Sequence, residues 1–134
     1  MAPKIWAKGA ILDRRSINST DSSYAQAHEV SNPSRILFIS GQVPVADDES
    51  VPKDFKSQCT LTWKNIEAQL KAAGMTLANL AKITVFLSDR KYRRENFEVR
   101  SEVLGKSITP AMTIVITGIY DEAWLLEIEA IAVA

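Results

Sequence analysis

Residues 125–133, with the sequence LLEIEAIAV, decide the fold because two sets of side chains alternate along them, as in a strand with one buried face. Successive side chains of a strand point to opposite faces of its sheet. One face carries Leu126, Ile128, Ala130 and Ala132, and the other carries Leu125, Glu127, Glu129, Ile131 and Val133. The first face predicts a buried sheet surface. The second sets two carboxylates roughly 7 Å apart on a mostly apolar surface.

The segments before this strand predict helices and a further strand. In residues 54–73, apolar side chains recur at three- and four-residue steps, which places them on one face of a helix that ends at Gly74. They are Phe55, Cys59, Trp63, Ile66, Leu70 and Ala73. Residues 80–88 return to the spacing of a strand. Asp89 is a suitable cap for a second helix, which Gly105 ends. Its stripe is Tyr92, Asn96, Val99 and Val103.

The remaining segments complete an α+β fold. RILFIS at 35–40 is compact and β-branched and predicts a buried strand, and a short strand is expected at 4–12. Residues 111–119 precede the final strand by a five-residue connection, 120–124, which favours an antiparallel pair. The order predicts a mixed sheet with two helices on one face. The uncovered face carries many apolar residues, so we expect oligomerisation to cover it.

Length and composition favour one cytoplasmic domain over residues 1–134. The chain is 46% hydrophobic and 24% charged, as ordinary globular proteins are. Sixteen basic and sixteen acidic side chains cancel, so no overall field attracts nucleic acid or anionic lipid. The only cysteine, Cys59, forms no disulfide within the chain, which fits a reducing compartment. No window resembles a signal peptide or a membrane-spanning helix, and we expect no membrane partner.

Several kinds of site do not fit these residues. The glycines at 9, 41, 74, 105 and 118 are too scattered for a phosphate loop or a dinucleotide fingerprint. One histidine and one cysteine cannot make a conventional zinc site, so no metal is expected. His28 would have to serve any serine–histidine–aspartate triad, and no serine lies in a nucleophile elbow.

Glu127 and Glu129 leave two interpretations open. Their face meets solvent or another subunit with paired charges, or one glutamate lines a pocket and activates water as a general base. The basic cluster Arg90–Arg94 is followed by acids along the helix, and aromatic residues do not interleave with it. This pattern favours a solvated helix start over a nucleic-acid surface.

Four segments in order resemble the Rid family, also called the YjgF family of reactive-intermediate deaminases or perchloric-acid-soluble proteins. They are Tyr24-Ala25-Gln26-Ala27, Ile39-Ser40-Gly41-Gln42-Val43-Pro44, Pro110-Ala111-x-Thr113 and Leu126-Glu127-Ile128-Glu129-Ala130-Ile131-Ala132. The match covers roughly residues 17–134. The resemblance implies a chorismate-mutase-like α+β fold, a homotrimer with inward-facing sheets, and small-molecule clefts between subunits. It also implies no metal or organic cofactor.

The resemblance further implies a site in which a glutamate positions water for attack on an imine carbon. Carried over by position, that glutamate is Glu127 and the cleft's tyrosine is Tyr24. Ser40 and Gly41 would bind the ligand, and Ile114 stands where the family often has a small or thiol side chain. The family's asparagine on the second helix is replaced by Glu98, whose charge would repel a carboxylate.

Met112 is the main departure from the family's pattern. The family has an arginine there, which holds the substrate carboxylate through two parallel charged donors. Methionine offers only a flexible apolar arm, and losing such a charged pair costs about 2–5 kcal/mol. No basic residue near it in the sequence is an obvious substitute, although Arg35, Arg94 or Arg100 could reach in from another subunit.

Three functions follow as hypotheses. The first is a hydrolase or deaminase-like enzyme that acts on a substrate other than a typical 2-imino acid, with Glu127 orienting water and Met112 and Ile114 forming an apolar floor. The second is a non-catalytic trimer that binds or senses a metabolite. The third, a ribonuclease or translation inhibitor as attributed to some members, is disfavoured by the zero net charge.

Overall fold

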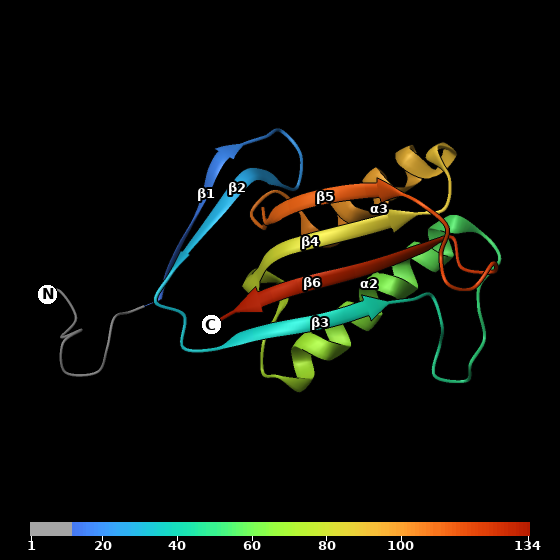
Figure 1. The fold of residues 1–134 in the computed structure, drawn as a ribbon, viewed down its shortest axis with the longest axis horizontal. Coiled ribbons are helices and arrows are strands. Elements are labelled where there is room, and N and C mark those ends of the chain that lie inside the picture. Colours follow the sequence, from blue (N-terminus) through green and yellow to red (C-terminus); the bar gives the residue numbers. More distant parts are fainter. Residues whose placement is uncertain (1–11) are drawn as a thin grey trace, which may run out of the picture.

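The computed structural model describes residues 12–134, which form a sheet and a layer of helices (Figure 1). The strands are β1 (Asp13–Ser19), β2 (Ala25–Ser31), β3 (Ile36–Gln42), β4 (Leu80–Leu87), β5 (Ala111–Ile116) and β6 (Leu126–Val133). The helices are α2 (Phe55–Ala72) and α3 (Arg93–Leu104), with short 3-10 turns η1 (Leu77–Asn79) and η2 (Arg90–Tyr92). Both long helices lie behind the sheet in Figure 1. The predicted α+β fold, a mixed sheet with two helices on one face, is confirmed.

The six strands lie in the order β1-β2-β5-β4-β6-β3. β4 is central, parallel to β5 on one side and antiparallel to β6 on the other. The expected antiparallel pairing of the last two strands is therefore wrong, because β4 lies between them. The short connection 117–125 still joins β5 to β6, but it crosses the end of β4 rather than forming a hairpin.

Helix α2 forms where the sequence predicts it, and its ends explain why. The side chain of Asp54 accepts a hydrogen bond from the Ser57 backbone N–H, which satisfies a free donor of the first turn. Gly74 follows the last turn with a φ of +71°, a conformation that residues with a side chain rarely adopt. The expected stripe faces the sheet, and Trp63, Ile66 and Leu70 are fully buried.

The N-terminal part of the chain differs from what the sequence predicts. The strand expected at 4–12 lies outside the described residues, apart from Leu12. The hairpin of β1 and β2 was not predicted, although it forms a continuous antiparallel ladder from Asp13–Ser31 to Ser19–Ala25. Its strands, DRRSINS and AQAHEVS, are mostly polar and lack an apolar alternation. Backbone pairing, rather than burial of side chains, forms this hairpin.

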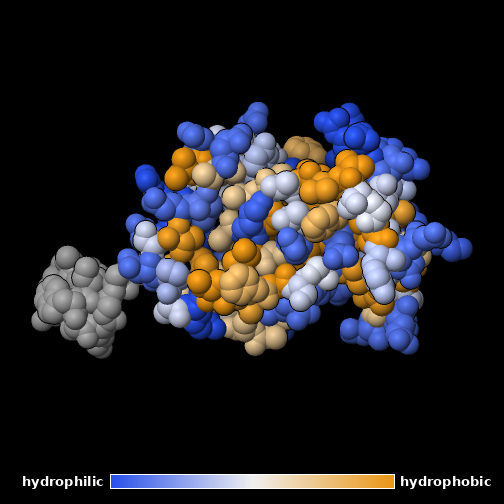
Figure 2. Space-filling model, in the orientation of Figure 1, coloured by the Kyte–Doolittle hydropathy of each residue, from blue (hydrophilic) through white to orange (hydrophobic). Residues whose placement is uncertain are grey.

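The two faces of the sheet differ in how they are covered. On the helix side, Leu126, Ile128, Ala130 and Ala132 of β6 are buried, as the alternation predicts. On the open side, apolar and polar residues are interspersed over the surface in Figure 2. Ile36 and Phe38 of the edge strand β3 are 53% and 74% exposed there. Within residues 12–134, no helix is long and apolar enough to cross a membrane.

Candidate functional site

Glu127 and Gly41 lie side by side on the open face of the sheet. β3 and β6 are antiparallel neighbours, and an irregularity in their pairing between Ile39 and Gln42 changes the register at this point. A Cβ atom added to Gly41 would lie 1.9 Å from Oε2 of Glu127. The φ of Gly41 is not positive, so its backbone conformation does not call for glycine. A side chain at position 41 would displace the Glu127 carboxylate, which occupies that space.

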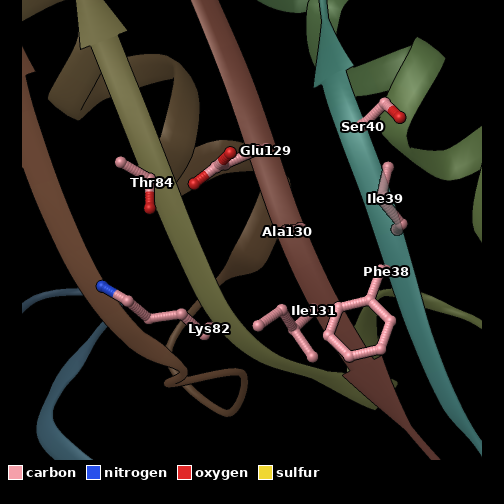
Figure 3. A pocket seen from close by; sticks show the side chains of 8 residues that line it. All are labelled: Phe38, Ile39, Ser40, Lys82, Thr84, Glu129, Ala130 and Ile131. Atoms are coloured by element: carbon pink, nitrogen blue, oxygen red, sulfur yellow. The ribbon is translucent and has the colours of Figure 1, made fainter.

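Ser40 lines a hollow on the same open face (Figure 3). The hollow has a volume of about 360 Å³ and lies over β3, β6 and β4. Phe38 and Ile131 lie beside each other at one end of it, and Glu129 lies near Thr84 (Figure 3). It is shallow and mixed in polarity, with the apolar end formed by one of the most exposed aromatic rings of the chain. Such a surface can pack against another protein chain.

A second cavity lies on the opposite side of the sheet, between β5 and α3. It has a volume of about 470 Å³ and is lined by Leu87, Arg90, Arg93, Asn96, Phe97, Arg100, Ile114 and Ile116. Ile114 is thus at a cavity, as expected of a ligand-binding residue, and is 41% exposed. The lining includes three arginines and no acidic residue. Its polar side is supplied by the first turns of α3 and by η2.

Arg100 is almost completely buried beside this cavity, with an exposed fraction of 3%. Its Nε donates to the Ser23 hydroxyl at 3.2 Å and its Nη2 donates to the Ser22 hydroxyl at 3.3 Å. Nη1 has no hydrogen-bond partner among the described residues. Burial lowers the pKa of the guanidinium from its ordinary value, an effect that the neighbouring Tyr24 partly offsets.

Tyr24 belongs to the same side of the molecule. It directly precedes β2, whose first residue, Ala25, donates its backbone N–H to the carbonyl of Pro110 at 3.1 Å. Ala25 also pairs with Ala111 across the parallel strands β2 and β5. The tyrosine segment and the start of β5 are therefore held together, although they are far apart in sequence.

Met112 points toward the core rather than into a cavity. It pairs with the fully buried Ile83 in the β4–β5 ladder, so both side chains face the helices. It is half-buried and packs against the edge of the core. The expectation of Met112 as a wall of the ligand site is not supported by either cavity, since it lines neither of them.

Asn96, one turn before Arg100 on α3, is 1% exposed. Its Oδ1 accepts a long, weak bond from the Cys59 thiol at 3.9 Å, while its Nδ2 has no partner among the described residues. Burial raises the pKa of that thiol to about 12, so it remains protonated. Asn96 appeared in the predicted apolar stripe, and an amide at such a position is a signal that could have marked it as functional.

The residue that we expected near the cleft on this helix, Glu98, lies elsewhere. Its carboxylate is 3.4 Å from the Lys56 ammonium on the exposed side of α2 and α3, and it does not line the cavity with Ile114. Within one chain, Glu98 is therefore not placed to repel a carboxylate in this cavity. Of the three arginines considered as replacements for the missing one, Arg100 lines this cavity within its own chain.

The predicted site residues form two groups on opposite faces of the sheet. Ser40, Gly41 and Glu127 lie on the open face over β3 and β6. Tyr24 and Ile114 lie toward α3, near Arg100 and Asn96. One chain does not bring the two groups together. Within residues 12–134, no three histidine, cysteine or acidic side chains gather as metal ligands would.

Comparison with known proteins matches residues 16–134 to the family described as Endoribonuclease L-PSP. A RutC family protein of Pyrococcus horikoshii is 39% identical over 111 residues, which cover 81% of this chain and 85% of the relative. TdcF of Escherichia coli, named as a candidate reactive intermediate deaminase, is 32% identical over 101 residues, with 73% and 78% covered.

Solved structures with the same fold include several with more than 25% identity. The crystal structure of Escherichia coli TdcF with bound serine has a TM-score of 0.71 and 29% identity, covering 86% of this chain and 91% of TdcF. RidA from an Antarctic Psychrobacter has a TM-score of 0.70 and 28% identity, covering 87% and 92%. The likeness extends over nearly all the described residues.

Proposed function

The chain belongs to the Rid family, also called the YjgF or endoribonuclease L-PSP family, and on that premise we propose that it is a single-domain, cofactor-independent hydrolase. Its substrate is a small imine-like or enamine-like metabolite bound between subunits. Glu127 positions the attacking water. Water adds to the carbon of the C=N bond as Glu127 takes up one of its protons and passes it to the nitrogen. Transfer of the second proton from the adduct's hydroxyl to the nitrogen accompanies cleavage of the C–N bond, which releases ammonia and leaves a carbonyl group.

The observation that carries this proposal is the space that Gly41 leaves for the Glu127 carboxylate. Gly41 has no side chain where Oε2 of Glu127 lies, so the carboxylate rests against the backbone of β3. Glu129, two residues along the same strand, is exposed and has no such enclosure. A carboxylate that is held in place by a tight fit is a better general base than one that moves freely, because its orientation is fixed before the reaction.

A homotrimer would complete the site. The open face carries exposed apolar side chains on β3, which a second copy of the chain would cover. The two groups of site residues lie on opposite faces of one sheet, so packing one chain's open face toward a neighbour's β5 and α3 would bring them into one cleft. The bound serine in the related TdcF structure supports a small polar metabolite as the ligand class.

Met112 bears on which imine is hydrolysed. It offers no charged donor, and it packs against the core. A small 2-imino acid whose carboxylate had to be held at that position would lose about 2–5 kcal/mol of binding. We therefore expect weak turnover of the simplest imino acids. The same observation favours, as a second candidate function, a trimer that binds a metabolite without converting it.

A screen of imines generated in place by an amino-acid oxidase tests the proposal. Release of ammonia above the uncatalysed rate is expected for one class of substrate. Glu127→Gln should then reduce turnover at least 100-fold without changing the oligomer. Glu129→Gln is the matched control on the same face of β6 and should retain most of the activity. Equal activity of the wild type and Glu127→Gln would contradict the role of Glu127, and no turnover of any imine would favour the binding function.

A further inference from the structure

Helix α3 carries two buried hydrogen-bond donors without partners on the same face. Asn96 and Arg100 are four residues apart, which places their side chains one above the other. Nδ2 of Asn96 and Nη1 of Arg100 have no hydrogen-bond partner among the described residues. Buried donors are nearly always satisfied, and one left unpaired loses the hydrogen bond that water would otherwise give it. Both residues line the cavity between β5 and α3.

The charge of Arg100 is also without a partner. A guanidinium stays protonated under all ordinary conditions, so it cannot avoid the cost of burial by becoming neutral. Among residues 12–134, the ion pairs are Arg15–Glu29 and Lys56–Glu98, and none includes Arg100. Arg90 and Arg93 add positive charge at the same cavity, and no acid lines it. A buried charge in such a place requires a negative group from elsewhere.

The orientation of the guanidinium is set before any ligand arrives. Two serine hydroxyls hold its Nε and Nη2, and the ring of Phe97 lies 5.6 Å from its central carbon. These contacts are neutral, so they fix the geometry without cancelling the charge. They leave Nη1 as the unpaired donor of the group.

We propose that Arg100 and Asn96 bind the carboxylate of a small organic acid in the cavity between β5 and α3. Two free donors, one charged and one neutral, match the two oxygens of a carboxylate. Leu87, Ile114, Ile116 and Phe97 form apolar walls suited to a short hydrocarbon portion.

This assignment adds to the proposed function that the substrate carries a carboxylate. It rests on the proposed function in one respect, which is that this cavity forms part of the substrate cleft. The substrate would carry its carboxylate at α3 rather than beside Met112. Its reacting carbon would then face Glu127 of a neighbouring copy. Arg100 is in this account a binding and specificity-determining residue, whereas Glu127 performs the chemistry.

Binding of propionate, followed by titration calorimetry or NMR on the purified full-length protein, tests the assignment. Propionamide is the neutral probe of the same shape. The wild type should bind propionate at least tenfold more tightly than propionamide, and Arg100→Met should weaken propionate binding at least tenfold. Arg94→Met, an exposed arginine of α3 outside the cavity, is the matched control and should bind as the wild type does.

A second variant guards against poor folding of Arg100→Met. Asn96→Asp places a carboxylate beside the guanidinium, so it should preserve the fold and abolish propionate binding. Propionate binding that survives in both variants, or equal binding of propionamide, would overturn the assignment. Tighter binding of inorganic phosphate than of propionate would overturn the carboxylate as the ligand.

Glu127→Gln separates this inference from the proposed hydrolysis. It should bind propionate at least as tightly as the wild type does, because the substitution removes a negative charge from the cleft and leaves Arg100 and Asn96 unchanged. Normal propionate binding by a protein that hydrolyses no imine would support Arg100 and contradict the hydrolase. Imine hydrolysis by a protein whose propionate affinity is unaffected by Arg100→Met would support the hydrolase and contradict the role of Arg100.

Discussion

The two faces of the sheet are formed by the same strands, but only one of them is covered within the chain. On the helix side, Trp63 and Ile128 are fully buried and the core is closed within one chain. On the open side, Phe38 remains 74% exposed beside Ile131 and a shallow hollow. β6 contributes to both faces through simple alternation. The difference leaves one hydrophobic surface closed within the chain and one open, as the proposed oligomer requires.

The largest expected effect comes from the closed side. Trp63→Ala should destabilise the fold by about 3–5 kcal/mol, because it leaves a large cavity under α2. Urea unfolding should show this loss at every protein concentration, since the contacts lie within one chain. Phe38→Ala is the comparison on the open side, and its effect should depend on concentration because its partners are other chains. A loss for Phe38→Ala that is independent of concentration would contradict the contrast between the faces.

A smaller effect on stability but a large one on activity is expected from Gly41→Ala. The new Cβ would meet Oε2 of Glu127 at 1.9 Å, and the end of a flexible side chain can move away at modest cost. Turnover of any identified substrate should fall as far as it does in Glu127→Gln. Gly118→Ala is the control, because a Cβ there has no atom within 4 Å. Full activity in Gly41→Ala would show that the position of Glu127 against β3 is not required.

The smallest effect concerns the β1–β2 hairpin, which belongs to neither apolar face. Nε of Arg14 donates to Nε2 of His28 at 3.2 Å, which requires a neutral imidazole. Burial and the charge of Arg14 lower the pKa of His28, and the contact with the Thr109 backbone opposes this only in part. The Ser16 hydroxyl lies 3.5 Å from the other ring nitrogen.

Because the folded pKa of His28 is below its ordinary 6.5, protonation favours the unfolded chain. Stability should therefore fall as the pH drops below about 6.5, and it should stop falling below the folded pKa. His28→Gln should flatten this part of the curve, measured by urea unfolding between about pH 7.5 and 5. The same slope in both proteins would show that another group is responsible.

Local periodicity predicted those elements whose side chains are buried by their own helix or strand. α2, β4 and β6 follow from the recurrence of apolar residues, and the caps Asp54 and Gly74 define the limits of α2. The β1–β2 hairpin did not follow, because its polar residues carry no such pattern. The pairing of β5 was missed because the crossover through α3 places it beside β4, and chain proximity to β6 was the misleading signal.

Half of the candidate site could be predicted in the same way. Glu127 was conspicuous as a carboxylate on an apolar face, and Gly41 lies where a motif placed it. Arg100 was not conspicuous in the sequence, because its significance depends on contacts with Ser22 and Ser23, more than seventy residues away. An arginine on a charged helix has no distinguishing pattern in sequence. Only the tertiary structure shows that it is buried without an acid.

The measurement that tests the central claim most directly is the solution mass of the wild-type protein by light scattering. The open face and the divided site predict an oligomer, and the proposed homotrimer has three times the 14.8 kDa of one chain. Phe38→Glu, which places a charge on that face, should shift the mass toward one chain. A wild-type mass equal to a single chain, at concentrations where the protein is folded and active, would contradict the account.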